Sequence, residues 1–280
     1  ASQKRIDEFL NVKPDITSAS SASIVVAGEI EFKKVSFTYP STGIKALKQI
    51  SFIVKKGHRM AVIGRTGSGK STLGQLLVRM YDPDEGEILI DGVNIKSLNL
   101  PALRRQVGYV SQDVFLFSDT VFNNIGFGMN VSEMDAESVK TAATYAVVHQ
   151  DVLQLPEQYE TVVGERGITL SGGQKQRISI ARALIKEPQI LVFDDCLSAV
   201  DAQTEKNILG YLNDFLQNRT TIIITHRIFS LFNFDQIIVI DDGQIIEQGN
   251  HQSLMKRRGA YFDLFEKQQS EERKATAPVE

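Results

Sequence analysis

Several common protein classes are excluded by what this sequence lacks. One cysteine, Cys196, occurs in 280 residues, which rules out an intrachain disulfide framework and fits a reducing compartment. The 31 Lys and Arg are outnumbered by 34 Asp and Glu, for a net charge of -3, so we expect no nucleic-acid partner. No uninterrupted apolar run reaches about 18 residues, the length at which a membrane-spanning helix is expected.

The two ends of the chain differ in composition from its middle. Residues 2–11 fit a short amphipathic helix, and the last residues are charged and poor in apolar side chains. The start has no initiator methionine and is typical of a fragment of a longer polypeptide. We therefore predict a linker over 1–27, a compact domain over 28–265 and a flexible tail over 266–280.

Part of the chain predicts antiparallel strands. Residues 28–57 alternate apolar and polar side chains, as half-buried strands do. Residues 86–95 and 237–246 each place Asp-Gly between two short apolar runs, which is a strong β-hairpin signal.

Three other strands are continuous apolar runs, at 60–63, 190–193 and 222–224, as expected for strands buried on both faces of a parallel sheet. Each leads into polar or glycine-bearing residues and then a helical pattern, which predicts sites at the carboxyl ends of the strands. Residues from about 118 to 185 turn helical. The predicted fold class is α/β: a mostly parallel phosphate-loop (RecA-like) sheet core, with an antiparallel β subdomain and an inserted α-helical subdomain.

A phosphate-binding loop is predicted at 64–71, where GRTGSGKS fits G-x-x-x-x-G-K-[ST] between an expected strand and an expected helix. Its glycines allow backbone N–H groups to point at phosphate oxygens, and the helix N-terminus adds partial positive charge. We expect Lys70 to reach the β- and γ-phosphates of ATP and Ser71 to coordinate Mg²⁺. The predicted nucleotide-binding residues here are Gly64, Arg65, Thr66, Gly67, Ser68, Gly69, Lys70, Ser71 and Thr72.

An acidic site is predicted at the end of the strand 190–193. Asp194 follows that apolar run, as does the acid that faces Mg²⁺ across a phosphate loop, and we expect it to act through a metal-bound water. The alternative for Asp194 alone is that it caps a turn. Asp195 comes next and supplies a second carboxylate.

One further motif makes the chain resemble the nucleotide-binding domain of ATP-binding-cassette (ABC) transporters over about 28–265. The sequence LSGGQ, the family's signature, follows Lys70 by about 100 residues. Ser171 and Gln174 fit a capping box, and two glycines expose backbone N–H groups as an anion site. The resemblance implies that this helix end faces the γ-phosphate held by a second nucleotide-binding domain. The signature residues are Leu170, Ser171, Gly172, Gly173 and Gln174.

The resemblance assigns roles to several other residues. Tyr39 matches the aromatic residue that stacks on adenine, and Gln112 matches the glutamine that contacts Mg²⁺ and the attacking water and relays nucleotide state to the membrane domain. His226 matches the switch histidine that contacts the γ-phosphate. Ser198 and Asp201 match the loop that crosses between paired domains. If the resemblance is set aside, Tyr39 can be interpreted as a half-buried strand residue and Asp201 as a helix cap.

Asp195 departs from the family, whose members usually have Glu at this position to polarise the attacking water. Its carboxylate is withdrawn by one C–C bond, about 1.5 Å. The site then either turns over slowly beside a better partner in a heterodimer, or Asp195 suffices with His226 and Gln112 in a homodimer. With Asp195 as base, the implied activity is ATP hydrolysis.

Residues 161–167, 113–117 and 123–125 resemble exporters rather than importers, and residues 3–10 resemble the end of a helix from a fused membrane domain. This implies an exporter motor at the cytoplasmic face of a membrane. The alternatives are a soluble ATPase of the same superfamily, an ATP-gated clamp without turnover, and a small-molecule kinase, which has no use for the signature.

Overall fold

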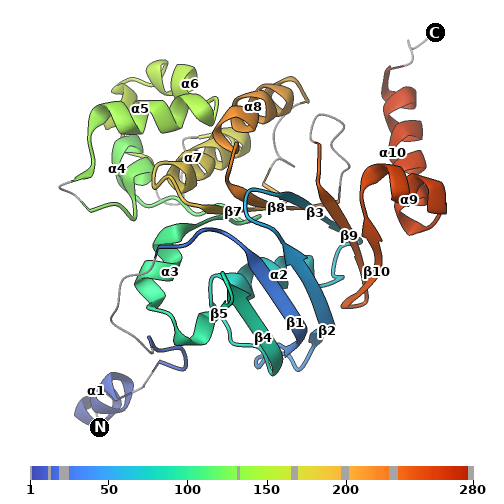
Figure 1. Cartoon of the computed structure of the whole chain (residues 1–280). Helices are drawn as coiled ribbons and strands as arrows, with labels where there is room; N and C mark the ends of the chain where they lie inside the picture. The colour runs from blue at the N-terminus through green and yellow to red at the C-terminus, as the bar shows by residue number, and fades with distance from the viewer. Residues whose placement is uncertain are drawn as a thin grey trace.

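The computed structural model describes residues 2–11, 14–18, 25–130, 133–164, 170–196, 202–226 and 233–276. Two sheets form its centre (Figure 1). The strands are β1 (Ile30–Thr38), β2 (Lys45–Val54), β3 (Arg59–Gly64), β4 (Glu85–Ile90), β5 (Val93–Asn94), β6 (Val107–Val110), β7 (Ile190–Asp194), β8 (Thr220–Thr225), β9 (Gln236–Asp241) and β10 (Gln244–Gly249).

The larger sheet has the order β10-β9-β3-β8-β7-β6, and all its pairs are parallel except β9 with β10. The three continuous apolar runs form β3, β7 and β8 at its middle, as predicted. Their side chains alternate between two faces: Met60 and Val62 enter one core, whereas Ala61 and Ile63 enter another. The smaller sheet, β2-β1-β4-β5, is antiparallel and includes the predicted hairpin at Asp91-Gly92. The fold class is therefore confirmed.

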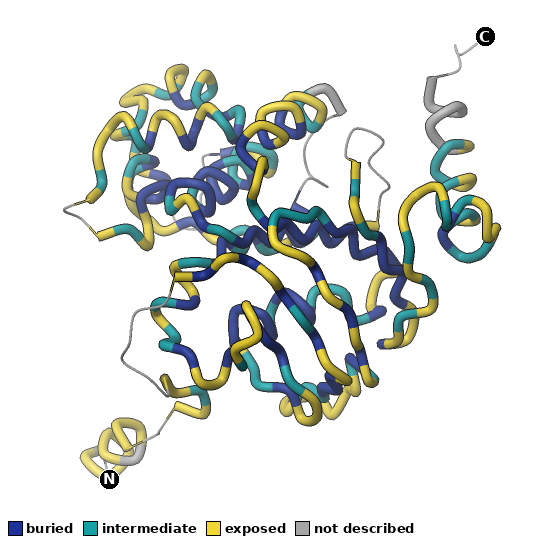
Figure 2. The backbone as a smooth tube through the Cα atoms, viewed as in Figure 1, coloured by how far each residue is buried: buried dark blue, intermediate teal, exposed yellow. Residues whose placement is uncertain are grey.

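Helices cover both faces of the larger sheet. Figure 1 shows α4 to α8 on one face, α2 on the other face between the two sheets, and α9 and α10 beside β10. The dark central strands of Figure 2 are buried by these layers. The helices are α1 (Ser2–Leu10), α2 (Lys70–Leu77), α3 (Leu100–Gln106), α4 (Val121–Gly126), α5 (Ala136–Tyr145), α6 (His149–Leu153), α7 (Gly172–Leu184), α8 (Ala202–Phe215), α9 (His251–Arg257) and α10 (Ala260–Thr276), with short 3₁₀ helices at Ile95–Ser97 and Gln158–Glu160.

The domain limits differ in two places from those expected. Val26, placed in the linker by the sequence, is buried in the core of the smaller sheet, and the Asp91 carboxylate accepts hydrogen bonds from the N–H groups of Ala27 and Gly28. At the other end, α10 continues to Thr276 although a flexible tail was expected from residue 266. Its residues are mostly Glu, Gln, Lys, Arg and Ala, which are good helix formers, so low apolar content did not predict disorder.

The helical insert, α4 to α7, lies within the expected range 118–185. Its core includes Ile125, Val139 and Ile178 and is continuous with Leu191 of β7. Within the described part of the chain, no helix is both long enough and apolar enough to cross a membrane.

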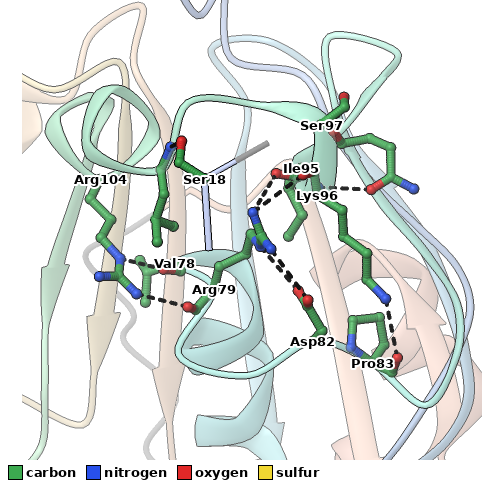
Figure 3. A network of polar contacts seen from close by, with 11 residues as sticks. Ser18, Val78, Arg79, Asp82, Pro83, Ile95, Lys96, Ser97 and Arg104 are labelled. Atoms are coloured by element: carbon green, nitrogen blue, oxygen red, sulfur yellow. Dashed lines mark hydrogen bonds and ion pairs between the residues drawn. The ribbon is translucent and has the colours of Figure 1, made fainter. Parts of the chain in front are cut away.

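The far end of α2 is held by arginines (Figure 3). Arg104 of α3 donates hydrogen bonds to the carbonyls of Val78 and Arg79, at 3.0 and 2.8 Å. Arg79 is itself buried at positive φ, and its Nε donates to Asp82 at 3.0 Å. A cationic group at the last carbonyls of a helix stabilises that end. These contacts fix α2, whose opposite end begins at the phosphate loop.

Candidate functional site

The predicted phosphate loop turns tightly between β3 and α2. Its residues 64–69 include Gly67 and Gly69 at φ values of 79° and 98°, a backbone region that glycine adopts without steric cost. A Cβ on Gly69 would lie 2.3 Å from the carbonyl oxygen of Ala46. The loop can therefore approach β2 this closely only with glycine here.

Lys70 begins α2 and reaches back over the loop. Its Nζ donates hydrogen bonds to the carbonyls of Gly64 and Arg65, at 2.9 and 2.7 Å. Burial lowers the pKa of Lys70, while the carboxylates of Asp195 and Asp194 oppose that shift. An ammonium group beside a glycine-rich loop and the N-terminus of α2 is suited to bind a phosphate.

The acidic strand meets the phosphate loop through Asp194, which is 2% exposed. The Ser71 hydroxyl donates to Oδ1 at 2.9 Å, and the Tyr109 hydroxyl donates to Oδ2 at 3.0 Å. Burial raises the pKa of Asp194, and these two hydrogen bonds act in the opposite direction. The structure thus joins two of the three residues predicted to hold Mg²⁺.

Most predicted nucleotide and catalytic residues line one cavity of about 330 Å³. Gly64, Arg65 and Ser68 belong to the loop but do not line the cavity, and the Ser68 hydroxyl is buried beneath it. The predicted residues that do line it are Tyr39, Thr66, Gly67, Gly69, Lys70, Ser71, Thr72, Gln112, Asp194, Asp195 and His226.

The donor set of this cavity fits Mg²⁺. Hard divalent cations prefer oxygen ligands. The Ser71 hydroxyl and the Gln112 amide can supply them directly, and the Asp194 carboxylate can do so through a metal-bound water. Among the described residues, no three His, Cys, Asp or Glu side chains cluster as a metal cage. A site with so few protein ligands suits a cation that keeps several waters and binds substrate phosphates.

Asp195 and His226 follow the adjacent parallel strands β7 and β8. The two Asp195 carboxylate oxygens lie 3.0 and 3.1 Å from Nδ1 of His226. Asp195 sits at a φ of 45°, and its N–H donates to the carbonyl of Ile224 at 2.8 Å. The structure therefore brings the predicted base and the predicted switch histidine into direct contact.

Tyr39 forms the cavity wall next to α2. Its hydroxyl lies 2.9 Å from the Thr72 hydroxyl and donates to the Gln75 amide oxygen at 2.8 Å. Its ring meets Phe37 and Tyr81 edge to face, with centroids 5.0 and 5.6 Å apart. These contacts hold the ring where a flat base could pack, and stacking on adenine stays a prediction.

The signature residues lie apart from the cavity, because none of Leu170 to Gln174 lines it. Ser171 caps α7 by accepting from the Gln174 N–H, and the Gln174 amide oxygen accepts from the Ser171 N–H, so the predicted capping box is present. Asp151 of α6 accepts from the Gln174 amide nitrogen at 3.2 Å and from Arg177 at 2.9 and 3.1 Å. The exposed N-terminus of α7 is thus firmly oriented. Ser198 and Asp201, the predicted loop between paired domains, lie outside the described residues.

Tyr109 and Asp151 were missed by the sequence reasoning. A tyrosine in a buried strand needs a partner for its hydroxyl, and that signal was available for Tyr109. Asp151 offered none, since its partner Arg177 is 26 residues away on another helix.

The family model and the similar proteins all point to the ABC transporter family. A sequence model of the ABC transporter family matches residues 47–198. The uncharacterized ABC transporter ATP-binding protein YfiB of Bacillus subtilis is 44% identical over 96% of this chain and 46% of its own length. The probable multidrug resistance ABC transporter ATP-binding/permease protein YheI of the same species is 45% identical over 96% and 46%. The ATP-dependent lipid A-core flippase of Escherichia coli K12 is 42% identical over 86% and 41%.

A solved structure of a bacterial Atm1-family ABC exporter with ATP bound superposes with a TM-score of 0.89 at 38% identity. That match covers 99% of this chain and 47% of the exporter chain. The chain therefore spans less than half the length of these relatives.

Proposed function

This chain belongs to the ABC transporter family as an exporter-type ATPase domain, and we propose that it binds Mg²⁺ and ATP in its cavity and drives export as half of a paired motor. The observation that carries the proposal is the contact of Ser71 with Asp194, which joins the phosphate loop to the acidic strand. Lys70 lies over the same loop.

The described residues divide the work of hydrolysis. The loop N–H groups and Lys70 bind and orient the phosphates, while Ser71, Gln112 and Asp194 would hold Mg²⁺. When bound, Mg²⁺ would neutralise charge on the β- and γ-phosphates. Asp195 would orient the attacking water, and His226 would contact the γ-phosphate.

The proposed pairing of two domains is supported by the separation between the ATP cavity and the signature residues. The glycine-rich N-terminus of α7 is an anion site in chemical character, yet it does not line the cavity of its own chain. A second nucleotide-binding domain can place its ATP against that helix end. We therefore propose that two such domains close around two ATP molecules.

The second domain is proposed to be a different chain. The short Asp195 side chain lies against Nδ1 of His226, so it is poorly placed to hold a water deeper in the cavity. The intact signature, Leu170 to Gln174, would complete the site of a partner with a stronger base. This domain would then hold its own ATP for long periods.

The partner in the membrane is proposed to dock on an exposed aromatic surface formed by Phe115, Phe117 and Phe127. The rings pack on one another with centroids 5.0 and 4.2 Å apart, and the guanidinium of Arg182 lies 5.7 Å from two of them. Exposed apolar clusters of this kind mark interaction sites. The segment that carries Phe115 and Phe117 follows Gln112, which lines the cavity. We propose a membrane domain at the cytoplasmic face as the partner that docks on this aromatic surface. The closeness of the surface to Gln112 and the permease portion in the name of YheI both support this partner.

Binding and hydrolysis by the purified chain test the proposal. With Mg²⁺, a fluorescent ATP analogue should bind, and Lys70→Ala should weaken it about 10- to 100-fold, as expected for losing a charged hydrogen bond. The matched control, Lys140→Ala on the exposed face of α5, should bind normally. Phosphate release should stay slow across a wide range of protein concentration.

Two outcomes would contradict it. If the wild-type chain binds no ATP, or if Lys70→Ala binds as well as wild type, the proposed site is wrong. If hydrolysis is fast, rises more steeply than linearly with concentration and is lost in His226→Ala, the domain works as its own partner and the unequal pair is wrong.

A further inference from the structure

We infer that Tyr109 is a positioning residue of the predicted metal site: its hydroxyl fixes the Asp194 carboxylate, which would help to hold Mg²⁺. The inference rests on the proposed function, because it concerns the same cavity. Neither the phosphate-loop motif nor the signature includes Tyr109, which lies on β6 in register with Val192 of β7.

The Asp194 carboxylate is shared between two donors. Ser71 donates to Oδ1 at 2.9 Å and Tyr109 donates to Oδ2 at 3.0 Å, so each oxygen has its own donor. Asp194 as a residue is 2% exposed, so its side chain has little contact with bulk solvent. Two donors from different elements restrict its rotation more than either alone.

The Tyr109 ring is also restricted by its packing against α2. It packs against α2 so closely that a Cβ on Gly74 would lie 2.7 Å from its Cε2 atom and 3.2 Å from Val192 Cγ1. Contact with α2 limits where the ring can place its hydroxyl. The phenol is the donor in this bond, because an ionised carboxylate can only accept.

The Tyr109 hydrogen bond is also compatible with bound metal. Ser71 would then turn its oxygen to the cation, and its hydrogen bond to Oδ1 would change. The Tyr109 bond is to the other oxygen, Oδ2, and can persist. Partners of this kind orient metal-binding carboxylates, and their loss typically costs about 10- to 100-fold in metal affinity.

The test replaces only the hydroxyl, with Tyr109→Phe in the whole 280-residue chain. Two affinities are measured: a fluorescent ATP analogue in the presence of EDTA, and Mn²⁺ by electron paramagnetic resonance in the presence of a non-hydrolysable ATP analogue. We expect the metal-free nucleotide affinity to stay within about twofold and the Mn²⁺ affinity to fall about tenfold. The matched control is Tyr261→Phe, which removes another buried hydroxyl, bonded to His251 at 2.8 Å beside α9, and should change neither affinity.

A double-mutant cycle adds a second readout. In an Asp194→Asn background, Tyr109→Phe should cause no further tenfold loss of Mn²⁺ affinity, because the oxygen that it orients no longer carries the charge.

The following results would overturn the inference about Tyr109. An unchanged Mn²⁺ affinity in Tyr109→Phe overturns the inference while leaving the proposed function intact. An unfolded variant, or an equal loss of both affinities, shows that Tyr109 only packs and also overturns it. A wild-type chain that binds no nucleotide overturns the proposed function, and this inference with it.

Discussion

Lengthening one side chain, Asp195→Glu, tests why this domain is expected to hydrolyse slowly. Asp195 leaves β7 at a φ of 45° with its carboxylate 3.0 and 3.1 Å from Nδ1 of His226. Its side chain is 19% exposed and that of His226 is 47% exposed, so the histidine has room to move aside. The glutamate should therefore extend into the cavity rather than distort the strand.

The expected size of the effect follows from geometry. One added C–C bond advances the carboxylate by about 1.5 Å. Misplacing a reacting group by about 1 Å can cost roughly 100-fold in rate, so we expect a gain of about 10- to 100-fold. Asp tolerates the left-handed region better than Glu, and the variant should lose about 1 kcal/mol of stability. In a chain of this size that lowers the melting temperature by about 2–4 °C.

The assay is the initial rate of phosphate release at saturating Mg²⁺ and ATP, over a series of protein concentrations. Asp195→Asn is the control, since it keeps the size and backbone tolerance of aspartate but removes the base. Rates that are equal for wild type and Asp195→Glu, and well above Asp195→Asn, would refute the reasoning, because aspartate would then already suffice.

Two stability predictions concern the supports of the site. Gly74→Ala should destabilise the fold by about 1–3 kcal/mol, because its methyl group would collide with the Tyr109 ring; Gly210→Ala, where the space around the Cβ is open, should be neutral or stabilising in thermal unfolding. A drop no larger at Gly74 than at Gly210 would contradict the packing argument. Asp151→Ala leaves the largely buried Arg177 without its carboxylate and should cost about 1–3 kcal/mol in urea unfolding, whereas a cost below about 0.5 kcal/mol would show that the pair is unimportant.

Much of this fold could be predicted because local sequence and tertiary position agree. The three apolar runs at 60–63, 190–193 and 222–224 are too short and too continuous for surface elements, and they form the middle of the parallel sheet. The phosphate loop was predictable because its glycines, its lysine and its flanking elements must occur together. The helix α10 was not, because composition alone does not separate a solvated helix from a disordered tail.

The parts of the site that lie in short sequence motifs were predictable. The contacts between residues far apart in the sequence were not. Asp194, Asp195 and His226 end strands whose parallel pairing brings their carboxyl ends together. The hydrogen bond from Tyr109 to Asp194 joins residues 85 positions apart and depends on side-chain direction in two strands. The contact of Asp195 with His226 likewise depends on a left-handed backbone at Asp195, which no motif announces.

The phosphate-loop helix and the signature helix also belong to different hydrophobic cores. Leu73 of the phosphate-loop helix α2 packs with the smaller sheet, whereas Ile178 of the signature helix α7 packs with the helical insert. A change at Asp195 alters the chemistry of the domain's own cavity but touches neither α7 nor its clamp, Asp151. A weakened base is therefore compatible with an intact signature. In the unequal pair proposed above, this separation would let the domain retain its own ATP and still complete the site in which a partner hydrolyses another.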